Sequence, residues 1–450
     1  MDKDKLRSEG DINITDSRVA YWETNIDEDT AVLLEMDNKH FLHQSLSTPC
    51  LNVMESCKGA SIVDMEGRSY LDFHGNNVHQ VGFGNPEVIK AITKQMEELS
   101  FCTRRYTNKP AIDLAKKLVE LAPGDLNRVL FAPGGSLAIG MALKLARVKT
   151  GRFKTISMWD SFHGASLDAI SIGGEAIFRS EVGPLLPGAE HVPPPDAQNC
   201  PWDCAGECKL KCADYIEYVL EKECDVGAVI AETVRSTPYI PPKEYWQKVR
   251  AACDRHGALL ILDEIPHCLG RTGTMFTVEH YGIVPDMLVI GKGLGGGIFP
   301  LAALIAREEL NVMKDKALGH YTHEKNPVAC AASLAAIKYL QDEDILDHVG
   351  KIGKYALDGL RKLQGKYELI KDVRGMGLLL GIELANVNGK KPVDEAERIM
   401  YMALERGLNF KLTMGNILTL TPALTINYEE MDKALAILES CFEEVSELRA

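Results

Sequence analysis

The sequence predicts an α/β protein whose main sheet is mostly parallel. From about residue 80 to residue 330, apolar segments of strand length alternate with segments that favour helix, a pattern typical of strand–helix–strand units. Two apolar segments, Gly257–Asp263 and the one that ends at Gly291, are hydrophobic at nearly every position. Such continuity is expected of strands covered on both faces, as in a parallel sheet. The first segment ends in Asp263 and the second leads into Lys292.

Smaller elements flank this region. Val63–Asp72 alternates around a Glu-Gly turn, which predicts a hairpin. After Lys351, helical segments alternate with strands such as Gly377–Leu384 and Ile417–Leu420, so we expect a smaller α+β domain that the N-terminal segment joins. The predicted limits are an N-terminal arm with part of the small domain at 1–75, the large cofactor-binding domain at 76–330, and the C-terminal small domain at 331–450.

Composition and charge exclude several classes of partner. The 450 residues are 46% hydrophobic and 25% charged, with a formal net charge of −14 and a pI of about 5.4, as in ordinary soluble proteins. The negative charge argues against nucleic acid and anionic membranes as partners. No stretch approaches the ~18 consecutive apolar residues of a transmembrane helix. The first residues are polar and contain no apolar segment of the kind found in a secretory signal. We therefore expect a cytoplasmic protein.

Four of the twelve cysteines follow a four-residue step, at Cys200, Cys204, Cys208 and Cys212. Thiolates bind zinc or iron–sulfur clusters, but such sites usually contain cysteine pairs separated by two residues. In a cytosolic protein a disulfide is less expected than a metal site. We predict a loop of reduced thiols and no metal centre, with a structural metal or a disulfide as the alternatives.

Asp263 and Lys292 predict the chemistry of the site. Ligands of parallel sheets bind at the carboxyl ends of the strands, where both side chains should lie. A lysine among glycine and apolar neighbours can act as an amine nucleophile in Schiff-base chemistry. A cofactor that stores electrons in a pyridine ring also needs a carboxylate beside its ring nitrogen, and Asp263 can supply one. Taken alone, Asp263 could cap a strand and Lys292 could be a surface lysine.

A predicted turn supplies a phosphate site. Val129–Ala132 is a short apolar strand, and the glycines after it open a helix that runs through Arg147. Amide groups at a helix start bind anions, and glycine lets the backbone approach a phosphate closely. Gly135 and Ser136 are therefore predicted to bind the phosphate of pyridoxal phosphate.

Two further residues complete the predicted site. Phe162 follows the strand Thr155–Met158 and precedes a glycine, so it could stack on the pyridine ring or pack in the core. Thr322 lies in a predicted loop before the Ala-rich helix Val328–Tyr339, where it could cap the helix or bind an anion.

These motifs resemble the class III aminotransferase family of fold-type I pyridoxal-phosphate enzymes. The resemblance runs from about Leu51 to Ile426. Its most specific motifs are Leu262–Ile265 followed by Gly270–Gly273, Pro285-Asp286 before Gly291–Gly293, Phe162–Gly164, Asn326-Pro327 and Val373–Gly377. The family resemblance implies a large domain with a mostly parallel seven-stranded sheet, a smaller α+β domain, and a homodimer with shared active sites, or a tetramer built from it.

The resemblance also implies the role of individual residues. Lys292 would bind the cofactor covalently, and Asp263 would partner its ring nitrogen. Ile265 would pack on the ring face opposite Phe162, and Thr322 would reach the phosphate from the neighbouring subunit. The full set of predicted cofactor-binding residues is Gly135, Ser136, Phe162, His163, Glu232, Asp263, Ile265, Lys292 and Thr322.

Departures from the family pattern concern both cofactor and substrate. Pro266 stands where the family often has a glutamine that contacts the cofactor's ring hydroxyl, so His267 or another group would replace it. Near the C-terminus, Thr419 stands where members that bind an α-carboxylate have arginine, and the Glu-Pro-Val motif is altered to Glu232–Arg235. An ordinary α-amino-acid aminotransferase is disfavoured because the guanidinium group that would bind a carboxylate is missing.

Arg104 and Arg105 suggest a different substrate anion. Two adjacent guanidinium groups suit a phosphate or phosphonate dianion, although a pair of surface arginines is an equally open interpretation. This signature is similar to aminotransferase-like lyases that act on phosphoethanolamine or on a hydroxy-aminoethylphosphonate. The expected reaction is ammonia release from an amine such as (R)-1-hydroxy-2-aminoethylphosphonate, giving phosphonoacetaldehyde.

The alternatives share most of the mechanism. In each, Lys292 removes a proton from the amine-bearing carbon as general base. A lyase then expels a β-hydroxyl or phosphate group, whereas an omega-amine or amino-acid aminotransferase needs a keto-acid acceptor. A phosphoethanolamine-type phospholyase, a racemase or aminomutase, and a catalytically inactive regulator remain as further alternatives.

Overall fold

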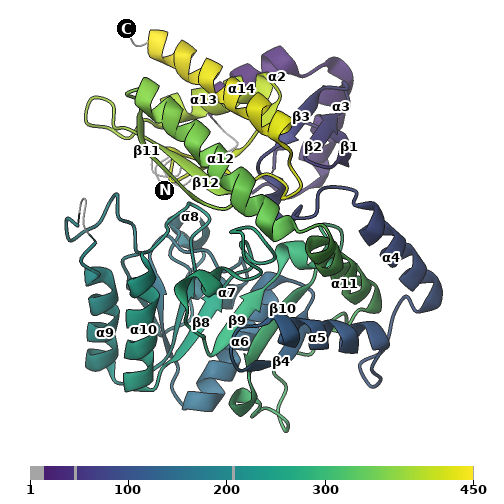
Figure 1. Ribbon diagram of the computed structural model, residues 1–450, viewed down its shortest axis with the longest axis vertical. Helices are drawn as coiled ribbons and strands as arrows, with labels where there is room; N and C mark the ends of the chain where they lie inside the picture. Colours follow the sequence, from purple (N-terminus) through teal and green to yellow (C-terminus); the bar gives the residue numbers. More distant parts are fainter. Residues whose placement is uncertain (1–14, 45–47, 205–207, 449–450) are drawn as a thin grey trace. The chain divides into compact units, whose positions relative to one another are not determined.

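The computed structural model describes residues 15–44, 48–204 and 208–448. They form two compact units (Figure 1), one from the described parts of 1–85 and 347–450 and the other from 86–346. The first is called the small unit and the second the large unit.

The large unit is built on a seven-stranded sheet. Along the sheet the strands are β4 (Leu126–Ala132), β10 (Ala302–Arg307), β9 (Met287–Ile290), β8 (Leu259–Asp263), β7 (Val226–Glu232), β5 (Lys154–Met158) and β6 (Ala189–Val192). From β9 to β6 neighbouring strands are parallel, and β10 is antiparallel to both of its neighbours. The predicted mostly parallel seven-stranded sheet is confirmed.

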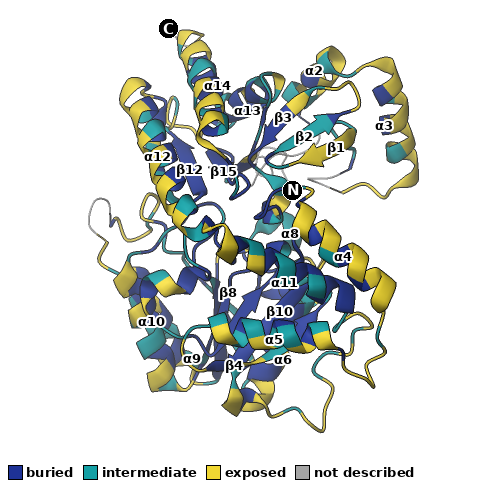
Figure 2. Ribbon diagram, turned by 45° about the vertical axis from the view of Figure 1, so that its right-hand side comes forward, coloured by how far each residue is buried: buried dark blue, intermediate teal, exposed yellow. Residues whose placement is uncertain are grey.

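Helices surround this sheet. Their bounds are α4 (Pro86–Glu98), α5 (Lys109–Leu121), α6 (Gly135–Thr150), α7 (Leu167–Ile172), α8 (Ala176–Arg179), α9 (Lys211–Glu223), α10 (Lys243–His256) and α11 (Pro327–Asp342), with the short η2 (Thr277–Tyr281), η3 (Lys292–Gly295) and η4 (Glu308–Leu310). Strands β8 and β9 are buried along almost their whole length (Figure 2). Burial on both faces explains why their sequences are continuously apolar.

The small unit contains two four-stranded sheets. The first has the order β1 (Met54–Lys58), β2 (Ser61–Asp64), β3 (Ser69–Asp72), β13 (Leu408–Asn409), and the second β11 (Ile370–Met376), β12 (Leu379–Leu384), β15 (Ile417–Leu420), β14 (Lys411–Thr413). Its helices are α2 (Asp16–Asn25), α3 (Glu28–His40), η1 (Gly75–Asn77), α12 (Ile345–Lys366), α13 (Val393–Glu405) and α14 (Tyr428–Glu447). Because β13 pairs with β3, the N-terminal segment joins the C-terminal one.

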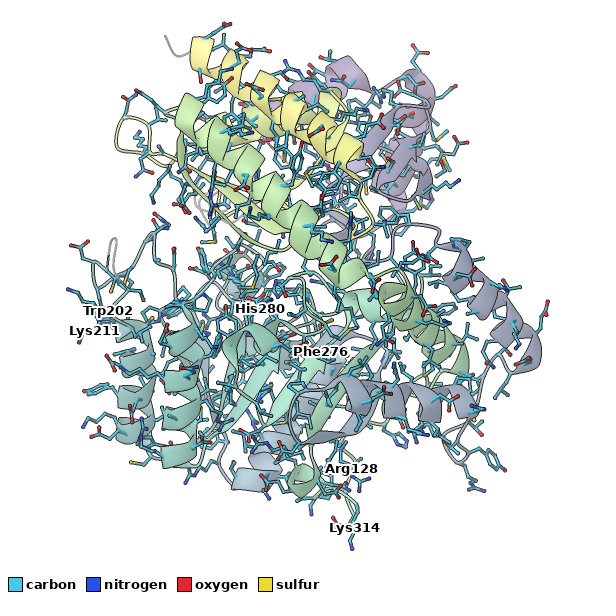
Figure 3. All side chains as sticks on the ribbon, in the orientation of Figure 1. Arg128, Trp202, Lys211, Phe276, His280 and Lys314 are labelled. Atoms are coloured by element: carbon cyan, nitrogen blue, oxygen red, sulfur yellow. The ribbon has the colours of Figure 1, made fainter. Side chains whose placement is uncertain are left out.

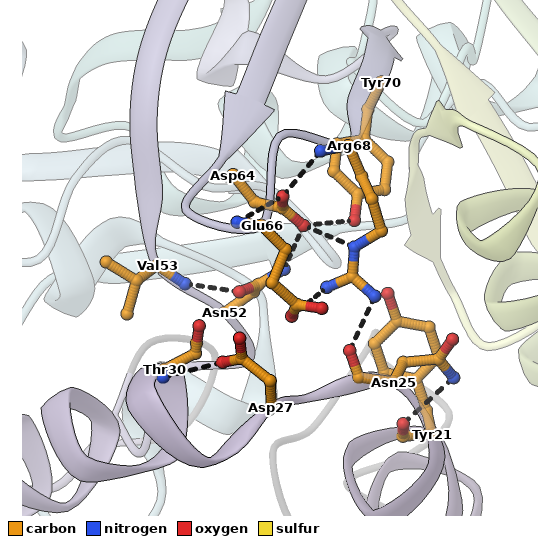
Figure 4. A network of polar contacts seen from close by, with 10 residues as sticks. All are labelled: Tyr21, Asn25, Asp27, Thr30, Asn52, Val53, Asp64, Glu66, Arg68 and Tyr70. Atoms are coloured by element: carbon orange, nitrogen blue, oxygen red, sulfur yellow. Dashed lines mark hydrogen bonds and ion pairs between the residues drawn. The ribbon is translucent and has the colours of Figure 1, made fainter.

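The predicted hairpin, β2 and β3, is fixed by a carboxylate network around Asp64 (Figure 4). Asp64 accepts hydrogen bonds from the Nε of Arg68 at 2.8 Å, from the hydroxyl of Tyr70 at 2.7 Å and from the Nδ2 of Asn52 at 3.0 Å. Arg68 also donates to the carbonyl of Asn25 at 2.6 Å. The network therefore ties the end of α2 to the hairpin.

Helix α11 belongs to the large unit, where it packs against α4 and α5. The unit limits, 85/86 and 346/347, consequently lie later in the chain than the predicted limits at 75/76 and 330/331. The sequence shows no break after α11, because that helix is apolar enough to pack against either neighbour.

The cysteine insertion contains no disulfide: Cys200, Cys204, Cys208 and Cys212 are all free. Trp202 and Lys211 lie in the same insertion (Figure 3). Across residues 15–44, 48–204 and 208–448, no group of three or more His, Cys, Asp or Glu side chains is gathered that could hold a metal ion. No helix in that part of the chain is long and apolar enough to cross a membrane.

Candidate active site

The carboxyl ends of three neighbouring strands bring together Glu232, Asp263 and Lys292. Glu232 ends β7 and Asp263 ends β8, and the two residues are direct partners in the parallel register. Asp263 is also paired with Val289 of β9, three positions before Lys292. Paired residues of parallel strands point to the same side of the sheet. The sheet thus places the two carboxyl groups side by side at the edge that binds ligands.

Asp263 is held by two hydrogen bonds. The Nδ1 of His163 lies 2.8 Å from its Oδ2, and the backbone N–H of Ile265 donates to its Oδ1 at 3.0 Å. Both side chains of the His163–Asp263 pair are buried. Since a carboxylate only accepts, the proton of His163 sits on Nδ1. The pair fixes the orientation of a buried carboxylate, as a ring-nitrogen partner requires.

Lys292 begins η3 and has a backbone φ of 45°. Left-handed backbone is uncommon for a residue other than glycine and costs free energy unless the surroundings impose it. Here the neighbouring segment is buried, with Gly291 packed against the side chain of Ile265. Lys292 is therefore a lysine in a constrained turn at the end of a buried strand rather than a mobile surface lysine.

The predicted phosphate turn has the necessary close approach. Helix α6 begins at Gly135, directly after β4. A Cβ added at Gly135 would lie 2.8 Å from the Cδ1 of Ile265, and one added at Gly164 would lie 2.0 Å from the Oγ of Ser136. A side chain at Gly135 would require Ile265 to move, and Gly164, with a φ of 124°, has no room for one. The turn at the start of α6 therefore lies against Ile265 on one side and the His163–Gly164 turn on the other.

Ile265 connects the parts of the site. Its side chain contacts both Gly135 in the phosphate turn and Gly291 beside Lys292, and it is only 8% exposed. Phe162, by contrast, is 36% exposed, with its ring 4.6 Å from that of Phe178. Phe162 is therefore partly exposed while its ring packs on that of Phe178, and its stacking on the pyridine ring stays a prediction.

Two further buried polar groups follow Asp263 in the chain, and sequence reasoning assigned no role to the first of them. Glu264 accepts hydrogen bonds from the hydroxyl of Thr233 and from the backbone N–H groups of Thr277 and Val278. These two N–H groups belong to η2, and Figure 3 labels the nearby Phe276 and His280. Burial raises the pKa of Glu264 to about 7, and these donors oppose the rise. Its hydrogen bonds make it a structural residue that ties η2 to β8.

His267 is the second. Burial, and then the charges of Lys292 and Arg271, hold its pKa well below the usual value, so the ring is neutral. Its Nε2 lies 3.1 Å from the hydroxyl of Ser236. The effect of the Lys292 charge on this pKa is compatible with His267 taking over the position of the family's glutamine.

Glu232 and Arg235 form a buried charge cluster with Glu175. The guanidinium of Arg235 donates to Glu175, and its Nε lies 3.7 Å from the Oε2 of Glu232. Burial raises the pKa of Glu232 to about 7, although Arg235 opposes the rise. Sequence reasoning named Glu232 but missed Glu175, which lies in a loop without a recognisable motif.

Thr322, Arg104 and Arg105 lie in two exposed loops of the large unit. Thr322 is exposed in the loop before α11, and Asn326, not Thr322, caps that helix. Arg104 and Arg105 are exposed in the loop between α4 and α5, where a guanidinium nitrogen of Arg104 lies 2.7 Å from the Nε2 of His320. The Arg104 loop and the Thr322 loop are therefore in contact.

The site fits pyridoxal phosphate. The helix start with its two glycine contacts suits a phosphate, the buried His163–Asp263 pair suits a pyridine nitrogen, and Lys292 lies at the adjacent strand end. The fold and this set of groups define a pyridoxal-phosphate enzyme.

Comparison with known proteins identifies its family. Residues 43–442 match the family model "Aminotransferase class-III". The (R)-1-hydroxy-2-aminoethylphosphonate ammonia-lyase of Vibrio splendidus (strain 12B01) is 46% identical, over 98% of this chain and 96% of that one. An aminotransferase of Bacillus anthracis has a TM-score of 0.86 at 29% identity, covering 93% of this chain and 99% of its own. An amine transaminase of an uncultivated Pseudomonas species, solved with PLP bound, has a TM-score of 0.83 at 29% identity, covering 90% and 98%.

The chain therefore belongs to the class III aminotransferase family. It is an enzyme, its fold is fold-type I, and its cofactor is pyridoxal phosphate.

Proposed function

We propose that this enzyme is an ammonia-lyase that converts (R)-1-hydroxy-2-aminoethylphosphonate to phosphonoacetaldehyde and ammonia. The observation that carries the proposal is the 46% identity, over nearly the full length of both chains, to the Vibrio splendidus ammonia-lyase of that name. In this proposal the chain acts in phosphonate degradation.

The geometry of the site supports the following proposed roles. The bound cofactor supplies an electron-withdrawing pyridine ring that acidifies the amine-bearing carbon of the substrate. Lys292 holds the cofactor and takes the proton from that carbon. Asp263, oriented by His163, keeps a proton on the ring nitrogen. When the cofactor is bound, Gly135 and Ser136 would hold its phosphate, and Phe162 and Ile265 would contact its ring.

A residue in the small unit supports a substrate without an α-carboxylate. Thr419 stands at the sequence position where family members that bind an α-carboxylate have arginine. It is buried in β15 with its hydroxyl 2.8 Å from that of Thr413. The two hydroxyls satisfy one another and provide no charge. An α-amino acid would therefore lack the bidentate partner that its carboxylate needs.

We further propose that Arg104 and Arg105 bind the phosphonate, and that the enzyme is a homodimer in which Thr322 binds the phosphate in the partner's site. The contact between the Arg104 loop and the Thr322 loop supports this, because the two loops would enter one site together. The twelve free cysteines agree with a cytoplasmic location.

The test of the function is ammonia and aldehyde release from the purified, cofactor-loaded enzyme. The substrates are (R)-1-hydroxy-2-aminoethylphosphonate, aminoethylphosphonate and phosphoethanolamine, each with and without pyruvate or 2-oxoglutarate. Release from the hydroxy compound without a keto acid is the expected result. Turnover that requires a keto acid would instead establish an aminotransferase, and phosphate release from phosphoethanolamine would establish a phospholyase.

Removing either arginine should weaken substrate binding more than catalysis. In Arg104→Ala and in Arg105→Ala we expect KM for the hydroxyphosphonate to rise about tenfold or more, because each loses a charge-assisted contact to a dianion. Steady-state kinetics measure the effect. Arg128→Ala is the matched control, since Arg128 is exposed on β4 and ion-paired with Glu308; Figure 3 labels it. If KM stays unchanged in both variants, the two arginines are not the phosphonate site.

A further inference from the structure

Glu232 differs from the other buried carboxyl groups around the site. Glu264 and Asp263 each accept at least two hydrogen bonds, and so does Asp286, from Arg250 and the backbone of Leu260. The side chain of Glu232 is 6% exposed, against 2% for that of Asp263. Among the residues that the structure describes, its ion-pair partner is Arg235. The distance from the Nε of Arg235 to the Oε2 of Glu232 is 3.7 Å, which is too long for a hydrogen bond.

A carboxyl group that is nearly covered and accepts no hydrogen bond from the described residues is free to exchange a proton with a bound molecule, and a catalytic role is one explanation for it. The position of Glu232 supports such a role. It is the register partner of Asp263 at the carboxyl ends of parallel strands, which is the edge of the sheet where ligands bind. The charged and titratable groups that influence it are Arg235, His163, Asp263 and Glu175.

The proposed reaction requires a proton donor that has not yet been assigned. Hydroxide is a poor leaving group, so the hydroxyl group on C1 of the substrate must be protonated as it departs. Lys292 takes its proton from the neighbouring carbon C2. A second group that is protonated near neutral pH could donate the proton to the hydroxyl group. Lys292 would then not have to pass on the proton that it takes from C2.

We propose that Glu232 is the general acid that protonates the departing hydroxyl group of the substrate. The inference rests on the proposed function and adds a catalytic residue to it. As the C2–H bond breaks, its proton goes to Lys292 and its electron pair forms the double bond between C2 and C1. The C1–O bond then breaks, its electron pair stays with oxygen, and the proton of Glu232 completes a molecule of water. Later hydrolysis of the unsaturated amine consumes one water, so the net products are aldehyde and ammonia.

The surroundings of Glu232 suit both halves of this transfer. Burial raises its pKa to about 7, so a large fraction of the enzyme carries the proton near neutral pH. After the transfer, the new carboxylate lies 3.7 Å from the guanidinium of Arg235, which stabilises the charge. Glu175 neutralises Arg235 from the other side and so helps to keep Glu232 protonated beforehand.

The test compares two leaving groups in Glu232→Gln, a variant that keeps the size and polarity of the side chain. With the hydroxy substrate we expect kcat to fall about 10²–10⁴-fold, the usual contribution of a general acid. With 1-chloro-2-aminoethylphosphonate, whose chloride leaves without a proton, we expect kcat within about threefold of wild type, since no acid is needed. In wild type, kcat for the hydroxy substrate should decline as the pH rises through about 7.

Two further readouts do not depend on turnover. Infrared difference spectra between wild type and Glu232→Gln, both with cofactor, should contain a protonated carboxyl band that disappears as the pH rises through about 7. In Glu175→Gln, Arg235 loses its second carboxylate and attracts Glu232 more strongly, so the band and the alkaline limb of kcat should both move to lower pH.

Equal loss of kcat with the hydroxy and chloro substrates would overturn the inference and make Glu232 a positioning residue. Absence of the carboxyl band would overturn it as well. Failure of the proposed function gives a different pattern, because wild type would then release no ammonia from the hydroxy substrate in the absence of a keto acid.

Discussion

Replacing Lys292 with alanine should reduce kcat by about 10³-fold or more, because the substitution removes both the covalent link to the cofactor and the general base. Lys292 begins a constrained turn beside buried strands, and no other lysine can take its place without rebuilding that turn. After borohydride treatment, mass spectrometry should find the cofactor attached to wild type at Lys292 and not attached to the variant. The phosphate turn at Gly135 is unaltered, so the variant should still bind the cofactor reversibly.

Lys314→Ala is the control, because Lys314 is exposed (Figure 3) and lies in the same unit. It should keep wild-type activity and cofactor attachment. Retention of the attached cofactor in Lys292→Ala would refute the assignment.

The Lys292→Ala variant, mixed with a second variant at Thr322, tests whether active sites are shared between the subunits of the dimer. The substitution Thr322→Glu should repel the cofactor phosphate by placing a like charge beside it. We expect a dimer made only of this variant to be inactive in both of its sites. If Thr322 acts in the partner's site, mixing it with Lys292→Ala gives hybrid dimers with one intact site, and activity should recover to about a quarter of wild type. If Thr322 acts within its own subunit, both hybrid sites are damaged and mixing restores nothing.

Replacing Asp263 with asparagine should reduce kcat by about 10²–10³-fold, the usual loss when a preorganised charge is removed from a reaction centre. Asparagine can still accept the hydrogen bond from His163, so the fold of the strand end should survive. It has no negative charge, however, and cannot keep the ring nitrogen protonated. The affinity for cofactor, measured by fluorescence titration, should change much less than kcat.

Asp286→Asn is the matched control. Asp286 is a buried carboxylate of the same unit that binds Arg250 and the backbone of Leu260. Its loss should lower the melting temperature and leave kcat of the folded enzyme unchanged. Equal kinetic effects in the two variants would mean that Asp263 has only a structural role.

The sequence by itself determined the strands that carry the chemistry. Two continuous apolar segments predicted β8 and β9, because a strand covered on both faces does not alternate between apolar and polar residues. The first segment ends in Asp263 and the second is followed by Lys292, so the positions of both residues were predicted as well. The glycines before α6 likewise predicted the phosphate turn. Both signals are local, since each depends on neighbouring residues within one segment.

Only the tertiary structure decided how distant segments meet. The bond between His163 and Asp263, residues 100 positions apart, depends on which strands are neighbours, and so does the register that pairs Glu232 with Asp263. The contact of Ile265 with both Gly135 and Gly291 and the antiparallel insertion of β10 have no local signature either. The physical reason is that strand order and register are set by packing between segments far apart in the chain. The charge state and orientation of each buried group follow from that packing.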